Sequence, residues 1–140
     1  MPPLIFITGA SSGIGQALAK RFYDAGYSLA LVARRTAEIE RWATAERLDL
    51  QRFKVYSADV ADTDSIVAAG RACLSAQGVP DVVVANAGIS IGMDTGIRGD
   101  IDVMQRTFAT NNTGLAATFH PFIAAMEQRG SGRLVGIGSV

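Results

Sequence analysis

The sequence predicts an α/β protein with a doubly wound, Rossmann-type parallel sheet. Short apolar runs alternate with longer amphipathic stretches along the whole chain, and the first apolar run leads directly into a glycine-rich turn followed by a helical pattern. The chain has 140 residues, of which 49% are hydrophobic and 19% charged, so it has enough apolar side chains for one packed core. We therefore expect residues 1–140 to form a single domain.

Five apolar runs are predicted to be strands, because each is rich in aliphatic residues and ends near a glycine or polar turn. They are Leu4–Thr8, Ser28–Ala33, Phe53–Ser57, Val82–Asn86 and Arg133–Ser139. Such near-continuous apolar runs suit strands that are covered on both faces. In a doubly wound sheet these strands are expected in the order 3-2-1-4-5, which leaves the fifth strand with an unpaired edge and apolar faces to be covered. We expect the sheet to be incomplete, truncated after this strand.

Helices are predicted between the strands, at Ile14–Ala25, Ala37–Arg47, Asp64–Gln77 and Ile101–Glu127. Gly26 stands where a helix-ending glycine is expected, and Asp62 or Thr63 is expected to cap the third helix. The fourth stretch is long for one helix, so we expect Gly114 and Pro121 to bend or divide it. Before it, Ser90–Asp100 has three glycines and little periodicity, which predicts a loop bordering a site.

Composition excludes several classes of function. The 13 Lys and Arg residues balance 13 Asp and Glu residues, and the arginines are scattered, which argues against nucleic-acid or anionic-membrane partners. With only Cys73 and His120, the chain has neither a disulfide framework nor a Cys/His zinc site. The sequence shows no basic signal-peptide start and no membrane-length apolar run, so we expect a cytoplasmic protein. Cys73 and Trp42 are interpreted as packing residues and His120 as structural.

The glycine-rich turn predicts a phosphate-binding site. The segment Thr8–Gly15 reads Thr-Gly-Ala-Ser-Ser-Gly-Ile-Gly, between an apolar strand and a helix. A turn of this kind lets the backbone approach a pyrophosphate and directs the free amides of the helix toward it, while Ser11 and Ser12 offer hydroxyl groups. The spacing G-x-x-x-G-x-G lacks the Lys-Ser/Thr ending of a nucleoside-triphosphate loop, so a dinucleotide is favoured. The alternative is a tight turn without a ligand.

Two arginines follow the second predicted strand, at the position where an acidic residue would bind the ribose hydroxyl of NAD. Arg34 and Arg35 instead offer forked donors that suit a 2′-phosphate, and no carboxylate is present there to repel it. NADP is therefore favoured over NAD. The alternative interpretation is that both arginines are solvated residues at the start of a helix.

Four motifs together resemble the short-chain dehydrogenase/reductase family, and they cover the whole chain in the family's order and spacing. They are Thr8–Gly15, Ala58-Asp59-Val60, Asn86-Ala87-Gly88 and Asn111-Asn-Thr-Gly114. Each motif alone is weakly specific, whereas the combination is specific. A methyltransferase-like sheet would instead have a differently spaced glycine loop and no Asn-Ala-Gly motif.

The resemblance implies the part of the cofactor that each motif contacts. Gly9, Ser11, Gly13, Ile14 and Gly15 would surround the pyrophosphate. Arg34 would meet the 2′-phosphate, and Asp59 with Val60 would flank the adenine. Asn86, Ala87 and Gly88 would line the cofactor and support the central sheet. Asp59 also has a simpler interpretation as a helix-capping or turn-forming residue.

The resemblance also implies catalytic roles for Asn111, which would position a water in a proton relay, and for Ser139, which would bind the substrate carbonyl or hydroxyl. From its residues alone, the Asn-Asn pair would be interpreted as a helix kink or a buried hydrogen-bonding device. The family's acid/base pair, Tyr-x-x-x-Lys, does not occur in this sequence. Because positioned acid catalysis contributes about 10²–10⁴-fold, we expect these residues alone to be nearly inactive.

Two hypotheses about function follow. The first is an NADP-dependent oxidoreductase that transfers hydride between the nicotinamide and a carbonyl or secondary-alcohol substrate, of which this chain is the cofactor-binding part. The second is a non-catalytic NADP-binding or subunit-interaction module. In the family the long helix packs against its counterpart in another subunit, so the resemblance also implies a homo-oligomer.

Overall fold

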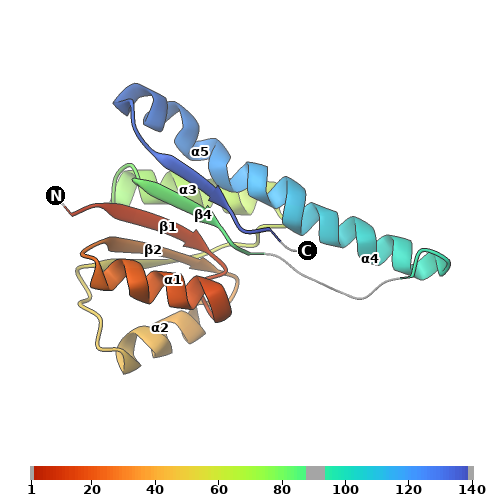
Figure 1. Ribbon diagram of the computed structural model, residues 1–140, viewed down its shortest axis with the longest axis horizontal. Helices are drawn as coiled ribbons and strands as arrows, with labels where there is room; N and C mark the ends of the chain where they lie inside the picture. The colour runs from red at the N-terminus through yellow and green to blue at the C-terminus, as the bar shows by residue number, and fades with distance from the viewer. Residues whose placement is uncertain (1, 88–93, 139–140) are drawn as a thin grey trace.

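The computed structural model describes residues 2–87 and 94–138, which form one parallel five-stranded sheet in the order β3-β2-β1-β4-β5 (Figure 1). The strands are β1 (Leu4–Thr8), β2 (Ser28–Ala33), β3 (Phe53–Ser57), β4 (Val82–Ala85) and β5 (Arg133–Gly136). The predicted fold class and strand order are confirmed. The last two strands are shorter than predicted: β4 stops before Asn86 and β5 stops at Gly136. Ser139 lies outside the described residues.

Helices cover both faces of the sheet, with α1 and α2 on one side and α3 and α5 on the other (Figure 1). Their bounds are α1 (Gly13–Asp24), α2 (Thr36–Ala45), α3 (Thr63–Ala76), α4 (Arg98–Phe108) and α5 (Gly114–Arg129). Asp62 is the residue that caps α3, because its side chain accepts a hydrogen bond from the amide of Ser65. Gly26 lies just beyond the end of α1 with a positive φ, as its predicted role requires.

The alternation of side chains along each strand divides the core into two layers. Phe6 and Val83 point toward α3 and α5, where they pack with Ile66 and Phe122. Residues that alternate with these on β1 and β4, together with residues of β2, point the other way and pack under α1 and α2; they include Ile5, Ile7, Leu29, Leu31, Val82 and Val84. Burial on both faces explains why the strands are continuous apolar runs rather than alternating ones.

The packing residues behave as expected. Cys73 is fully buried under the sheet, and this burial raises the pKa of its thiol to about 12, so the thiol stays protonated and unreactive at neutral pH. Trp42 is partly buried against the α1 and α2 layer. His120 is exposed on α5, away from the buried layers.

The predicted long helix is divided next to Gly114, one of the two residues at which the sequence suggested a bend or division. It begins at Arg98 rather than Ile101 and contains a π-helical turn, η1 (Ala109–Thr113), immediately before Gly114. Pro121 lies inside α5 without ending it. The expected loop at Ser90–Asp100 is therefore wrong over its last residues, which belong to α4, and its residues 90–93 lie outside the described part. In Figure 1, α4 extends beyond the carboxyl ends of the strands.

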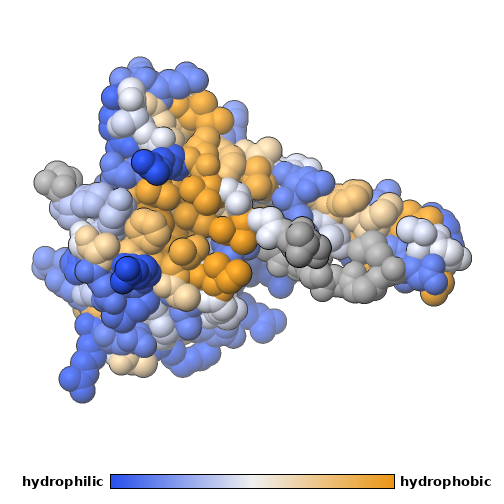
Figure 2. Space-filling model, in the orientation of Figure 1, coloured by the Kyte–Doolittle hydropathy of each residue, from blue (hydrophilic) through white to orange (hydrophobic). Residues whose placement is uncertain are grey.

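The edge strand β5 is exposed along its length. Leu134, Val135 and Ile137 keep 41%, 37% and 39% of their surface accessible. Figure 2 shows apolar side chains gathered between α5 and α1, on the part of the sheet that no described helix covers. This arrangement agrees with the expected unpaired edge of the fifth strand.

One close approach determines where the long helix crosses the sheet. A Cβ atom at Gly114 would lie 2.6 Å from the carbonyl oxygen of Val60, in the turn that follows β3. A backbone carbonyl cannot move away from such an overlap as easily as the end of a flexible side chain can. The absence of a side chain at Gly114 therefore lets α5 pack directly on this turn.

We predict that Gly114→Ala lowers the free energy of unfolding by about 1–3 kcal/mol, because the added methyl group overlaps the Val60 carbonyl. The matched control is Gly99→Ala in α4, where an added Cβ meets nothing within 4 Å. There the higher helix propensity of alanine should raise stability by about 0.5–1 kcal/mol. Urea denaturation followed by circular dichroism measures both; equal effects of the two substitutions would contradict this account.

Candidate functional site

The turn between β1 and α1 presents unpaired backbone amides at the carboxyl edge of the sheet. The first turn of α1 contains no acidic residue, and its N-cap, Ser12, makes no side-chain capping bond. Its first helical hydrogen bond runs from the amide of Gln16 to the carbonyl of Ser12, at 3.3 Å. Among the described residues, the amides that precede Gln16 in α1 have no acceptor. By contrast, α3 is capped by Asp62. The start of α1 is thus suited to a bound anion.

The turn is held close to the sheet by glycine packing and by Asn86. Gly9 adopts φ +65°, a conformation that favours glycine. The side-chain amide of Asn86 donates to the carbonyl oxygen of Gly9 at 3.3 Å. A Cβ at Gly15 would overlap that carbonyl and would lie 2.7 Å from Nδ2 of Asn86. The short distance between α1 and β1 therefore depends on Gly15 having no side chain.

Thr8 joins the ends of the two central strands. Its side chain is buried, and its Oγ1 accepts hydrogen bonds from the amides of Asn86 and Ala87, each at 3.0 Å. These two amides lie just beyond β4 and would otherwise have no strand partner. The Thr8 hydroxyl thus positions the backbone of Asn86 and Ala87 beside the glycine-rich turn between β1 and α1.

Asp59 stands in the turn between β3 and α3. Its Oδ1 accepts from the amide of Ala61 at 2.9 Å, and its own amide donates to Oγ of Ser65 at 3.0 Å. The turn-forming interpretation of Asp59 is therefore correct, and it leaves the other carboxylate oxygen available to a ligand.

Arg34 follows β2 and is exposed, and its guanidinium has no hydrogen-bond or ion-pair partner among the described residues. Arg35 occupies the N-cap position of α2 and is exposed as well. Arg34 thus belongs to the end of β2 and Arg35 to the start of α2. Only Arg34 borders the cavity that is described below.

These elements surround a cavity of about 800 Å³ at the carboxyl edge of the sheet. The predicted site residues that line it are Gly9, Ser11, Ser12, Arg34, Asp59, Val60, Asn86 and Ala87. The predicted residues Gly13, Ile14, Gly15, Arg35 and Asn111 are not part of its lining, and Gly88 and Ser139 lie outside the described residues.

The sequence analysis missed the contribution of the long helix to this cavity. Arg106, Ala109 and Thr110 complete the wall. Their spacing of three and four residues places them on one helical face. This spacing can be seen in the sequence, but nothing in the sequence showed that this helix borders the site. Asn111 follows in the π-helical turn and is half-buried. Such turns are frequent at functional sites.

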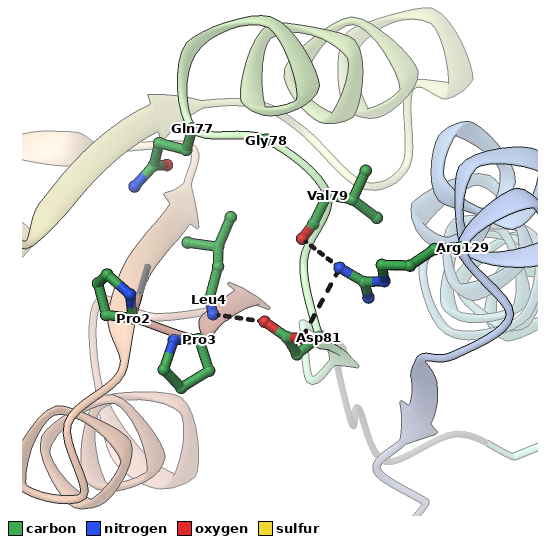
Figure 3. A pocket seen from close by; sticks show the side chains of 8 residues that line it. All are labelled: Pro2, Pro3, Leu4, Gln77, Gly78, Val79, Asp81 and Arg129. Atoms are coloured by element: carbon green, nitrogen blue, oxygen red, sulfur yellow. Dashed lines mark hydrogen bonds and ion pairs between the residues drawn. The ribbon is translucent and has the colours of Figure 1, made fainter.

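A second cavity, of about 330 Å³, lies at the opposite edge of the sheet (Figure 3). Its charged groups already have partners. The guanidinium of Arg129 donates to the carbonyls of Val79 and Pro80 at 3.0 and 2.8 Å and lies 3.7 Å from Asp81, whose carboxylate accepts from the amide of Leu4. This arrangement ties α5 to the starts of β4 and β1, so we interpret it as structural.

Residues 2–87 and 94–138 contain neither a metal-type cluster nor a membrane-spanning helix. Among them, no three His, Cys, Asp or Glu side chains are grouped as a metal site would require. No described helix has the length and apolar character needed to cross a membrane.

Comparison with known proteins identifies what the chain is similar to. The family model described as short chain dehydrogenase matches residues 3–140. A dehydrogenase/reductase SDR family protein 7-like from Anopheles gambiae is 36% identical over 143 residues, which cover 98% of this chain and 44% of that protein.

Two solved structures share the fold. A metagenomic short-chain oxidoreductase in complex with NADP has a TM-score of 0.87 at 25% identity, covering 99% of this chain and 62% of the other. A 3-ketoacyl-(acyl-carrier-protein) reductase from Brucella melitensis, complexed with NADH, has a TM-score of 0.78 at 30% identity, covering 92% and 53%. The chain thus spans only part of the length of the proteins that it matches.

We predict that Thr8→Val lowers the free energy of unfolding by about 1–3 kcal/mol, because it keeps the shape of the side chain but removes the acceptor of two amides. Thr8→Ser keeps the hydroxyl and serves as the control, with a smaller loss. Urea denaturation provides the comparison. If valine is tolerated better than serine, the Oγ1 hydrogen bonds do not hold the two strand ends together.

Proposed function

The chain belongs to the short-chain dehydrogenase family, and on this basis we propose that it is the cofactor-binding part of an NADP-dependent oxidoreductase. The single observation that carries the proposal is the cavity at the carboxyl edge of the sheet, where the uncapped start of α1, the Asp59 turn and Arg34 meet. In open parallel sheets, this edge is where dinucleotides bind.

A dinucleotide fits the residues present. The pyrophosphate would lie at the turn from Gly9 to Ser12, where free amides and two hydroxyl groups favour negative charge. The remaining predicted residues of this turn, Gly13, Ile14 and Gly15, would contribute backbone amides and close packing rather than side chains. Asp59 and Val60 would flank the adenine, with the free carboxylate oxygen accepting from its amino group. Asn86, Ala87 and Gly88 would line the path toward the nicotinamide.

The preference for NADP over NAD depends on Arg34. Its unpaired guanidinium borders the cavity, where it is available to bind a 2′-phosphate. No acidic residue follows β2 at this point of the sequence to select a ribose hydroxyl. Arg35 would act through its charge only, because it lies outside the cavity lining. One related structure is a complex with NADP and another a complex with NADH, so membership of the family does not by itself decide between the two cofactors.

The proposed reaction moves a hydride between the nicotinamide and the carbon of a carbonyl or secondary alcohol, with a proton moving to or from the oxygen. The nicotinamide supplies or accepts the hydride when bound. Asn111 would hold a water in the proton path from its π-helical turn, and Ser139 would hydrogen-bond the substrate oxygen. The sequence contains no Tyr-x-x-x-Lys pair, so we expect these residues to bind the cofactor with very little turnover.

A non-catalytic NADP-binding or interaction module is the competing function, since it needs the same cavity without the acid/base pair. It predicts cofactor binding without hydride transfer to any carbonyl.

A homo-oligomer is also proposed, through the long helix. Phe108 at the end of α4 and Ile123 on α5 are large apolar residues that are about half exposed, as helix faces at subunit contacts often are. Analytical ultracentrifugation is expected to show a dimer or larger species, and a monomer at micromolar concentration would remove this proposal.

The test of the proposed function is isothermal titration with NADPH and NADH. The wild-type protein is expected to bind NADPH more tightly than NADH. Arg34→Asp should remove the 2′-phosphate partner and add a repulsive charge, which lowers NADPH affinity by about tenfold or more while NADH affinity changes little.

The matched control is Arg41→Asp, on the exposed surface of α2, which makes the same change of charge outside the cavity lining. Equal losses of both cofactors in Arg34→Asp would contradict the NADP assignment, and no binding of either cofactor by the wild type would contradict the function.

A further inference from the structure

Arg106 is a second cation in the cofactor cavity that the motifs do not include. It lies in the last turn of α4 and shares the cavity-facing side of the helix with Ala109 and Thr110. Of the charged residues in the cavity lining, Arg34 and Arg106 are positive and Asp59 is negative. The side chain of Arg106 is exposed and has no hydrogen-bond or ion-pair partner among the described residues.

The orientation of Arg106 is not explained by an ion pair within its helix. Asp102 lies one turn before it, at a spacing that commonly pairs a carboxylate with an arginine. Asp102 instead pairs with Arg98, whose Nη1 lies 3.2 Å from its Oδ1. The two arginines of α4 therefore differ: Arg98 is neutralised along the helix surface, whereas Arg106 borders the cavity.

The surroundings of Arg106 suit a flat aromatic base. On the long helix, Arg106 shares the cavity lining with the small side chains of Ala109 and Thr110, and the turn after β3 contributes Val60 and Ala61. The contact of Gly114 with the Val60 carbonyl places the long helix directly against that turn. Small side chains leave room for a flat ring, and a planar guanidinium beside them favours stacking on that ring.

We propose that Arg106 stacks its guanidinium on the adenine of the bound dinucleotide, opposite the turn that contains Asp59 and Val60. This inference rests on the proposed function. The two cations then have different roles. Arg34 recognises the 2′-phosphate and so distinguishes NADP from NAD, whereas Arg106 strengthens binding of the adenine that both cofactors share.

The test compares Arg106→Ala with wild type in titrations with NADPH and with NADH. Both affinities are expected to fall by the same factor, about 3- to 10-fold, as loss of one partly exposed cation–π contact implies. Adenosine, used as a competitor that carries the base without any phosphate, should weaken by a similar factor. The matched control, Arg41→Ala, removes an exposed arginine outside the cavity lining without releasing a carboxylate near Arg106, and should bind as the wild type does.

Each other outcome overturns the inference. A loss confined to NADPH would make Arg106 a 2′-phosphate ligand, and unchanged adenosine competition would make it a pyrophosphate ligand. Unchanged affinity for both cofactors would show that Arg106 does not contact the cofactor, and an equal loss in Arg41→Ala would show that only the overall charge matters. These results leave the proposed function standing, because that function fails only if the wild type binds neither cofactor. Thermal unfolding of each variant establishes that the fold is intact.

Discussion

The contact between Thr8 and the Asn86-Ala87 backbone is the interaction on which the cavity depends. In a parallel sheet all strands end at the same edge. Beyond that edge the loops that follow β1 and β4 no longer make the hydrogen bonds of the sheet, so other groups must hold them together. The buried hydroxyl of Thr8 accepts both amides that leave β4, and Asn86 in turn holds the carbonyl of Gly9. The glycine-rich turn after β1 and the Asn86-Ala87 segment after β4 are therefore connected by hydrogen bonds and form one unit of the cavity lining.

The long helix supplies the opposite wall and is positioned by a different force. It packs on α3 through Pro121 and Phe122, which lie against Gly70, and it contacts the turn after β3 through Gly114. Both contacts are close packing of backbone and apolar atoms, with no polar bond to direct them. As α4 continues beyond the sheet, this packing carries Arg106 and Thr110 to the cavity (Figure 1).

Several charged groups outside the cavity are held by protein partners. Arg129 at the opposite edge donates to three carbonyl groups, Lys20 pairs with Asp24, and Arg98 pairs with Asp102. At the cavity, the first amides of α1 and the guanidinium groups of Arg34 and Arg106 have no partner among the described residues. Polar groups without a protein partner at a concave surface can be hydrated at a small cost in free energy, and they remain available to bind a charged ligand.

The sequence by itself determined the order of elements, the bounds of β1, β2 and β3, a capped start of α3 and the glycine-rich turn between β1 and α1. These features depend on residues close together in the chain: apolar runs, a capping side chain and glycines next to a helix start. The sequence left the cap open between Asp62 and Thr63, and the structure decided for Asp62. Only the tertiary structure decided that Arg34 borders the cavity while Arg35 does not, that the long helix changes to a π turn before Gly114, and that Arg106 faces the site. Each of these depends on which segments distant in sequence pack together, and local propensity contains no information about that packing.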